Sequence, residues 1–280
     1  QRRAGYLGAR REFNVTRDTS RTDGDNPRNR KPRAAEDRSG GFGEMVKTVV
    51  IAVFFALVIR SFAFEPFNIP SGSMKPTLLV GDYLFVSKYS YGYSRYFFPG
   101  SLPLFEGRIL SSPVKRGDVA VFRLPTDPSV DYIKRIVGLP GDRIQVIDGI
   151  LHINGTAVER RRIEDFVETG PGGQEIRIPR YVETMPDGGP SYETLDQTPY
   201  GALDNTPVYT VPAGHYFAMG DNRDNSQDSR VLSAVGFVPE ENLIGRAEVL
   251  FFSIDDSAAW WQVWKWPSAI RWSRLLDGVG

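Results

Sequence analysis

With 280 residues, the chain is long enough for one large domain or two modest ones. Its 41% hydrophobic and 24% charged residues are ordinary globular values, and its 34 basic and 34 acidic residues leave no net charge that would favour nucleic acid. The absence of cysteine excludes a cysteine nucleophile, thiolate metal sites and disulfides, and two histidines are too few for a multi-histidine metal site.

Residues 1–44 are predicted to form a disordered tail. This segment is rich in Arg, Asp, Asn and Gly, has few large apolar residues and shows no periodicity. Its basic cluster, Arg28, Arg30, Lys31 and Arg33, suits the cytoplasmic side of a membrane. A nucleic-acid-binding arm is the alternative, which the interspersed acidic residues disfavour. We therefore expect a solvated cytoplasmic tail and no nucleic-acid partner.

The segment from Met45 to Phe64 approaches the length of a membrane span. Its uninterrupted apolar core, 49–59, is short for a span of roughly 20 residues, but the whole segment suffices if Lys47 and Arg60 extend to the two interfaces. A cleaved signal peptide is disfavoured by the long charged tail in front and by the lack of an Ala-x-Ala site, and a buried core helix is a third reading. We predict one transmembrane helix over 45–64, with the remaining chain outside.

From residue 65 onward the sequence predicts strands and turns. Short β-rich runs occur at 83–86 and 118–122, and further strands are expected at 209–211, 216–219 and 246–254. No comparably strong helical period appears beyond the span. The fold class is therefore predicted to be mainly β.

The β region is predicted to contain a core and an inserted subdomain. Runs 144–147 and 150–153 flank Asp148-Gly149, which predicts a hairpin because Asp-Gly tolerates positive φ. Residues 156–211 are richer in Gly, Pro and charge, and we interpret them as an inserted, peripheral β subdomain. The β core would then comprise residues 65–155 and 212–256.

Residues 257–280 form a tail that contains all five tryptophans. Indole rings favour the headgroup layer of a membrane, so peripheral membrane contact is one interpretation of this tail. Packing of the tail against the domain is the other. Pro267 and the short length of the segment argue against a second span.

Ser73 is the candidate nucleophile. It lies in the turn-like stretch Pro70-Ser71-Gly72-Ser73-Met74, a few residues after the apolar segment, so its hydroxyl would lie close to a bilayer surface. A Ser-Gly-Ser tripeptide alone is weak support, because most such tripeptides are loops. A serine that attacks a carbonyl also needs a base to take its proton.

Lys134 is the candidate base. On a strand, Tyr132, Lys134 and Ile136 point to one largely apolar face, and burial there would lower the pKa of the lysine. A lysine at its reference pKa near 10.4 would be almost wholly protonated at neutral pH and unable to act as a base. A lone strand lysine that extends to solvent is the ordinary alternative.

The polar residues permit two other interpretations, a Ser-His-Asp triad and a calcium loop. His215, six residues before Asp221, permits a Ser-His-Asp triad, but nothing distinguishes it from a turn residue. The polar loop 220–230 alternates carboxylates and amides like a calcium loop, yet it lacks the twelve-residue spacing with a closing glutamate, and its two arginines would repel a cation. A self-bonded loop that presents one hydroxyl to Ser73 fits better.

Four blocks in order resemble the bacterial type I signal peptidases, membrane-bound Ser-Lys leader peptidases. The blocks are Pro70 to Leu78, Arg116 to Phe122, Asp131 to Asp142 and Gly220 to Arg230, and with the preceding span the resemblance covers the chain from about residue 46. It implies an antiparallel-sheet catalytic domain with an inserted β subdomain and one N-terminal transmembrane helix. The amino-terminal end would be cytoplasmic, although some members have two spans.

The resemblance also implies the roles of individual residues. Ser73 matches the nucleophile and Lys134 the general base, while the Ser71 hydroxyl and the Ser73 amide match the oxyanion hole. Ser226 matches the serine that orients the lysine, and Asp228 with Arg230 matches a structural ion pair. The walls of the substrate pockets correspond to a larger set: Phe67, Ile69, Pro70, Met74, Leu78, Tyr132 and Ile133.

The resemblance implies an endopeptidase that removes signal peptides from exported preproteins after small residues, at the outer face of the cytoplasmic membrane. Its partners would be preprotein signal peptides and the lipid bilayer, and no metal or organic cofactor is implied. One rival is a Ser-Lys protease of narrower specificity, such as a pilin-maturation or repressor-type peptidase. Another is an anchored β domain that binds envelope partners without catalysis.

Overall fold

The computed structural model describes residues 40–94, 107–170, 172–186, 188–255, 257 and 261–279. The chain divides into two compact units, residues 1–49 and 50–280. Most of the tail predicted to be disordered, 1–44, lies outside the described residues.

Helix α1, Gly40–Phe62, coincides with most of the predicted apolar helix. Its described side chains at positions 42–56 are exposed. None of the helices in the described ranges combines the length and the apolarity that a membrane crossing requires.

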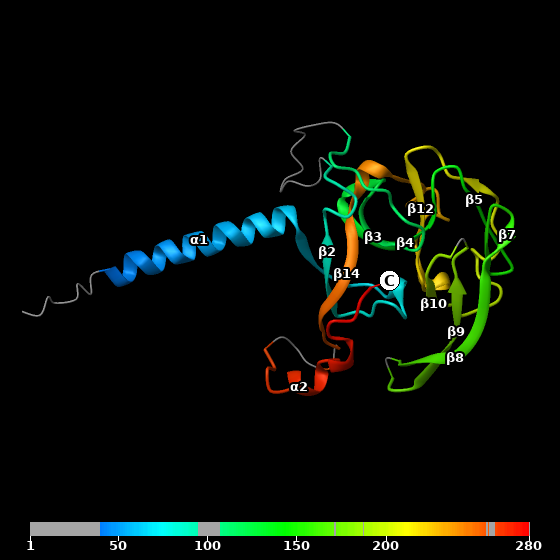
Figure 1. The fold of residues 1–280 in the computed structure, drawn as a ribbon. Coiled ribbons are helices and arrows are strands. Elements are labelled where there is room, and N and C mark those ends of the chain that lie inside the picture. The colour runs from blue at the N-terminus through cyan, green and yellow to red at the C-terminus, as the bar shows by residue number, and fades with distance from the viewer. Residues whose placement is uncertain are drawn as a thin grey trace, which may run out of the picture. The chain divides into compact units, whose positions relative to one another are not determined.

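A seven-stranded sheet frames the site, with Lys134 on one of its strands and Ser73 in a turn between two of them (Figure 1). Its strand order is β1-β2-β14-β3-β4-β12-β13, and every neighbouring pair is antiparallel. Its strands are β1 (Phe64–Asn68), β2 (Asp82–Ser87), β3 (Val119–Leu124), β4 (Asp127–Gly138), β12 (His215–Met219), β13 (Val238–Pro239) and β14 (Leu243–Ser253). The second half of β4 is buried on both faces, because the successive residues Ile136 and Val137 pack into two different core clusters.

Two smaller sheets follow β4 in the chain. The first has the order β11-β5-β6-β7, with β5 (Arg143–Ile147), β6 (Ile150–Ile153), β7 (Thr156–Ala157) and β11 (Tyr209–Thr210). The second has the order β10-β9-β8, with β8 (Glu159–Thr169), β9 (Glu175–Thr184) and β10 (Ser191–Leu195). The prediction of a mainly antiparallel β fold is therefore confirmed, whereas the boundaries of the inserted subdomain stay a prediction.

The predicted Asp-Gly hairpin is present. β5 pairs with β6 in antiparallel register, and the connecting Asp148 and Gly149 have φ values of 49° and 74°. Gly149 accepts this backbone conformation without the strain that a side chain would bring. The Asp148 amide is also bonded to the Asn205 side chain, at 3.0 Å.

The C-terminal segment packs along β14. It contains α2 (Trp266–Ala269) and the 3₁₀ turn η6 (Trp272–Arg274), and isolated bridges join Ile254 to Ile270 and Val249 to Gly278. This contact agrees with a tail that packs on the domain. Trp264 and Trp272 are nevertheless mostly exposed, so the membrane contact of this tail stays a prediction.

Candidate active site

Ser73 lies in the 3₁₀ turn η2, Gly72–Met74, between β1 and β2. The residue is only 8% exposed, and the following Met74 is fully buried. Met74 anchors the turn in a core cluster formed with residues of β2, β3 and β14. The apolar side chain after the serine therefore fixes the position of the serine hydroxyl.

The Lys134 amine reaches this hydroxyl from the middle of β4. Lys134 Nζ donates a hydrogen bond to Ser73 Oγ over 2.8 Å and another to the Ile133 carbonyl over 2.9 Å. The amine also lies 5.1 Å from the centre of the Tyr132 ring. Lys134 is 4% exposed, so the two groups meet in a nearly dry environment.

Burial lowers the pKa of Lys134 from 10.5 to about 8. Removal of water disfavours the charged ammonium, and this effect outweighs the opposing attraction of Asp228 and Asp221. An appreciable fraction of the amine is therefore neutral at mildly alkaline pH. A neutral amine can accept a proton from the hydroxyl that it contacts.

The loop after β12 holds η2 from the other side. The Asn222 backbone amide donates to the Ser73 carbonyl at 3.0 Å, and the Asn222 side-chain amide donates to the Gly72 carbonyl at 3.1 Å. This approach requires glycine at Gly220, where a Cβ atom would lie 2.6 Å from the Ser73 carbonyl oxygen. Asn222 was not singled out from the sequence.

A fully buried ion pair lies behind the two groups. Arg135 Nε and Nη2 donate to the two carboxylate oxygens of Asp221, at 2.9 and 2.8 Å. Thr77 donates a third hydrogen bond to the same carboxylate at 2.6 Å. The guanidinium also stacks 4.1 Å from the centre of the Tyr192 ring. This pair joins β4, the loop after η2 and the loop after β12, and no sequence pattern predicts it.

The predicted ion pair between Asp228 and Arg230 is present. Arg230 donates two hydrogen bonds of 2.9 Å to the two carboxylate oxygens, and Gly220 donates its amide at 3.0 Å. Burial opposes the charge of Asp228, but the neighbouring Arg230 holds the pKa of this carboxyl below its usual value. Arg230 Nη2 also donates to the Arg223 carbonyl at 2.6 Å, so the pair fixes the loop after β12.

Two predicted contacts are looser or absent. The hydroxyls of Ser71 and Ser73 lie 3.3 Å apart, and Ser71 itself is exposed. The Ser226 hydroxyl is buried beside the Asp228 carboxylate, and no hydrogen bond joins it to Lys134. The bond from Ser226 to Lys134 that an orienting role would need is therefore not made.

A cleft of about 600 Å³ opens in front of Ser73 and Lys134. Of the predicted pocket residues, five line it: Phe67, Ile69, Pro70, Tyr132 and Ile133. Met74 and Leu78 are not among the lining residues, and both are fully buried in the core cluster behind the wall. Their large apolar side chains are removed from water by the core itself, so they support the wall and do not face the cleft.

His215 is not part of this arrangement. It begins β12, and its Nδ1 atom lies 2.9 Å from the Ala213 carbonyl in the adjacent turn. The hydrogen bond that Ser73 receives comes from Lys134. The alternative Ser-His-Asp triad is therefore not formed.

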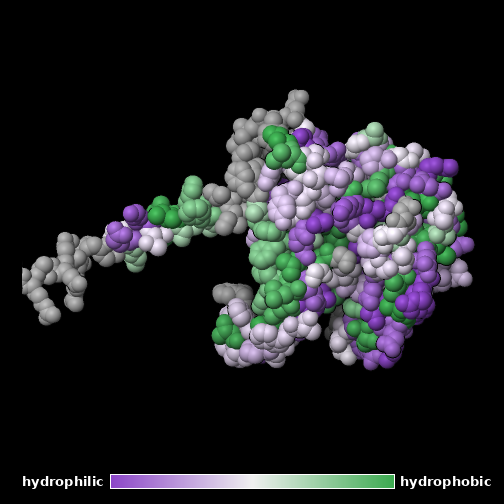
Figure 2. All heavy atoms as spheres, in the orientation of Figure 1, coloured by the Kyte–Doolittle hydropathy of each residue, from purple (hydrophilic) through white to green (hydrophobic). Residues whose placement is uncertain are grey.

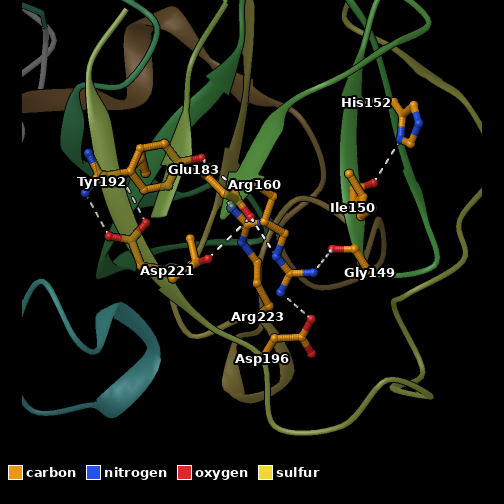
Figure 3. A network of polar contacts seen from close by, with 12 residues as sticks. Gly149, Ile150, His152, Arg160, Glu183, Tyr192, Asp196, Asp221 and Arg223 are labelled. Atoms are coloured by element: carbon orange, nitrogen blue, oxygen red, sulfur yellow. Dashed lines mark hydrogen bonds and ion pairs between the residues drawn. The ribbon is translucent and has the colours of Figure 1, made fainter. Parts of the chain in front are cut away.

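A second group of buried charges lies beside the loop (Figure 3). Arg223 Nη2 donates to Glu183 of β9 at 2.5 Å, and the Tyr192 hydroxyl donates to the same carboxylate at 2.9 Å. Burial disfavours the charge of Arg223, but Glu183 outweighs this effect and raises the pKa of the guanidinium. These contacts join the three-stranded sheet to the loop after β12.

Comparison of the sequence with known proteins shows the family to which this chain is similar. A family model described as signal peptidase, peptidase S26, matches residues 42–252. The chain is 42% identical to the signal peptidase I of Rickettsia conorii, over 91% of this chain and 97% of that protein. It is 45% identical to the signal peptidase I of Rickettsia akari, over 81% of this chain and 89% of that protein. The chain belongs to the signal peptidase family, S26.

The resemblance predicted from the four sequence blocks is therefore confirmed, and this signal peptidase family member is a serine peptidase, a hydrolase. A crystal structure of a signal peptidase I from Enterococcus faecalis V583 also matches the peptidase. The TM-score is 0.28 at 25% identity, over 48% of this chain and 97% of that chain.

Proposed function

We propose that this peptidase is a membrane-bound signal peptidase that cuts exported preproteins after small residues by means of a Ser73-Lys134 dyad. The observation that carries the proposal is the 2.8 Å hydrogen bond between a buried lysine amine and a buried serine hydroxyl at the head of an apolar cleft. Nucleophile and base within hydrogen-bond reach are the signature of an activated serine.

The reaction would proceed as two acyl transfers. Neutral Lys134 takes the proton of the Ser73 hydroxyl while Oγ bonds to the scissile carbonyl carbon. The ammonium then returns this proton to the leaving amine as the C–N bond breaks, which leaves an acyl ester on Ser73. Lys134 next takes a proton from a water molecule as the water oxygen bonds to the acyl carbon; the bond from this carbon to Ser73 Oγ then breaks, the proton returns to Oγ, and the carboxyl product is released.

Negative charge develops on the carbonyl oxygen in each transition state. We assign its stabilisation to the Ser71 hydroxyl and the Ser73 backbone amide. The Ser71 hydroxyl lies 3.3 Å from the Ser73 hydroxyl. This short distance supports the assignment, because Ser71 would then lie next to the carbonyl that Ser73 attacks. Donors fixed in advance stabilise such charge without having to reorganise during the reaction.

The cleft supports a preference for small side chains. Its walls near Ser73 include Ile69, Tyr132 and Ile133, which place apolar surface beside the nucleophile; we expect this surface to favour an alanine-sized group and to exclude water from the lysine. Ile133 also holds Lys134 through its carbonyl. The same wall would thus select the substrate and lower the pKa of the base.

A membrane surface is the proposed place of action. Hydrophobic side chains gather on one face of the domain over β1, β2 and β14 (Figure 2). Phe85 and Phe251 stack there with ring centres 4.3 Å apart, and Phe64 and Tyr83 are 36% and 37% exposed. Exposed aromatic rings in a contiguous group are typical of surfaces that contact lipid headgroups. The apolar segment 45–64 would supply the anchor.

Cleavage of unrelated preproteins tests the substrate class. The purified peptidase is expected to cut several preproteins that share only an alanine before the scissile bond. Replacing this alanine by tryptophan should lower kcat/KM at least about 100-fold, because a pocket that fits an alanine-sized group would exclude a large ring. Cleavage of a single preprotein only, or equal rates with alanine and tryptophan, would contradict the proposal.

The rate is also expected to depend on the charge of Lys134. Because the base has to be neutral and its pKa is about 8, kcat/KM should rise with pH up to that value and then level off. At pH 6 it should be about 100-fold below the plateau, since roughly one amine in a hundred is then neutral. A profile that is flat between pH 6 and pH 9 would exclude this base.

A further inference from the structure

Three carboxylates from separate segments converge beside the loop after β12. One oxygen atom each of Asp196, Asp204 and Asp224 lies within 4.8 Å of the others. Asp224 belongs to the 3₁₀ turn η4, Arg223–Asn225, whereas Asp196 follows β10 and Asp204 precedes β11. Asp196 and Asp204 are buried. Like charges at this distance repel one another unless a positive group lies between them.

The Asp196 carboxylate has one satisfied and one unsatisfied oxygen. Arg160 donates to Oδ2 at 2.5 Å and to the Gly149 carbonyl at 3.3 Å (Figure 3). The other oxygen, Oδ1, is enclosed by protein and accepts no hydrogen bond from any described residue. Asp196 is 7% exposed, and an anionic oxygen that is both buried and unpaired is costly. A bound cation or a proton at Asp196 Oδ1 would remove this cost.

The other two carboxylates are held by backbone amides. Asp204 Oδ2 accepts from Gly201 at 2.5 Å. Asp224 Oδ2 accepts from Gln197 and Thr198, at 2.7 and 2.9 Å. These bonds fix both side chains in place from the same loop. Two of the three groups are therefore oriented before any ligand arrives.

Gly201 borders the space among these carboxylates. A Cβ atom there would lie 2.2 Å from Asp224 Oδ1 and 3.1 Å from both carboxylate oxygens of Asp204. The φ angle of Gly201 is not in the left-handed region, so its backbone does not require glycine. Glycine is required here for space, because any side chain would occupy the volume beside the carboxylates.

We propose that Asp196, Asp204 and Asp224 bind a divalent cation of the size of calcium. Calcium binds carboxylate oxygens at about 2.3–2.6 Å, so two of its ligands can lie up to about 5 Å apart, which accommodates the observed group. Magnesium, with ligands at about 2.1 Å, would need the carboxylates closer together.

Both arginines of the 220–230 loop are already paired with carboxylates outside the proposed site. From the sequence alone they argue against a calcium site, but Arg223 is paired with Glu183 and Arg230 with Asp228. The loop contributes only Asp224 to the group, and the other two ligands come from outside the loop. The spacing rule for a continuous calcium loop therefore does not apply.

Bound calcium would join the loop 196–204 to η4. The neighbouring Asn222 holds the Ser73 and Gly72 carbonyls, so the cation would stabilise the same loop that positions the serine. Binding to the folded state alone raises its stability by mass action. The site is independent of the proposed reaction, because it contacts neither Ser73 nor Lys134.

Calorimetry and thermal unfolding of the chelator-stripped full chain test the site. Calcium chloride is expected to bind with one-to-one stoichiometry and a Kd of about 0.1–1 mM, as for weak carboxylate sites. At 10 mM calcium the Tm should rise by about 4 °C. Asp204→Asn and Asp224→Asn should each weaken binding at least about 10-fold, whereas Asp165→Asn, at a half-buried carboxylate of β8 that pairs with Arg162, should bind like the parent.

The outcomes of these measurements distinguish a bound cation from a proton shared among the carboxylates. Burial raises the pKa of Asp196 and of Asp204, so a shared proton is the competing occupant. A parent protein whose Tm does not change with calcium would overturn the proposal, as would a calcium response unchanged in Asp204→Asn and in Asp224→Asn. A response to magnesium without one to calcium would overturn the assigned cation size. Unfolding of each variant in chelator shows whether it is folded, and binding by the parent decides the question if a variant is not.

Discussion

Replacing either Ser73 or Lys134 by alanine is expected to lower kcat/KM for a preprotein by at least about 10⁴-fold. The two groups act as a unit, so removing one should cost nearly as much as removing both. Ser73→Ala deletes the atom that attacks the carbonyl. Lys134→Ala leaves no base to take the proton of this hydroxyl, because the amine that contacts Ser73 Oγ at 2.8 Å is removed. Cleavage of a purified preprotein by each variant measures the loss.

Stability measurements distinguish this loss from misfolding. Lys134→Met keeps most of the volume of the side chain and should also be inactive. It should raise the Tm at pH 7, because a buried ammonium no longer has to be desolvated. The destabilisation by Lys134 is complete below its folded pKa of about 8 and is relieved as pH rises from there toward its ordinary value of 10.5. Lys115→Ala, at an exposed lysine, should retain activity. An active Lys134→Met would refute the dyad.

Replacing Asp221 by alanine is expected to reduce the free energy of unfolding by about 3–5 kcal/mol. The substitution leaves the Arg135 guanidinium buried without its carboxylate, and an uncompensated buried charge is strongly destabilising. Arg135 cannot turn to solvent, because it is fully buried against the Tyr192 ring. Urea-induced unfolding of the variant and the parent measures this effect as a shift of the midpoint concentration of urea.

A paired substitution separates the lost ion pair from lost packing. Arg135→Met combined with Asp221→Leu removes both charges and keeps apolar volume, so its stability should lie much closer to that of the parent than the single variant does. A loss below about 1 kcal/mol in Asp221→Ala would show that the pair is not isolated from water. A double variant as unstable as the single one would show that packing, and not charge, is decisive.

Much of the fold followed from local patterns. The arms of the hairpin, 144–147 and 150–153, are strand-like runs rich in isoleucine that flank Asp148-Gly149, and the structure has β5, β6 and a left-handed turn at these positions. The strands expected at 83–86, 118–122 and 216–219 correspond closely to β2, β3 and β12. Such signals depend on neighbours along the chain, so a single sequence is enough to reveal them.

Long-range pairing was not accessible in this way. Arg135 stands next to Lys134 and resembles a solvated strand residue, yet its partner Asp221 lies 86 positions away. The sequence predicts an apolar face of β4 with Tyr132, Lys134 and Ile136, but it does not reveal that the opposite face, with Val137, packs into a second core cluster. No local pattern marks which arginine will find such a partner.

The candidate site was named from the sequence only in part. Ser73 and Lys134 were chosen, and their side chains meet. Asn222 was missed, because an asparagine in a polar loop bonds its own loop in most proteins. Ser226 was assigned to the lysine from the resemblance, but a side-chain hydroxyl near the end of a short turn has several rotamers, and this one does not reach the amine. The roles of all these residues remain predictions for the experiments above.

The most direct test of the account is the titration of the Lys134 amine itself. Nuclear magnetic resonance of protein with isotope-labelled lysine, compared with Lys134→Met, assigns the Cε and Nζ signals of this residue. We expect its pKa to be near 8, because the strand and the walls of the cleft remove water from the amine. A pKa above 10 would mean a hydrated, charged lysine that cannot take the proton of Ser73, and the proposed mechanism would be wrong.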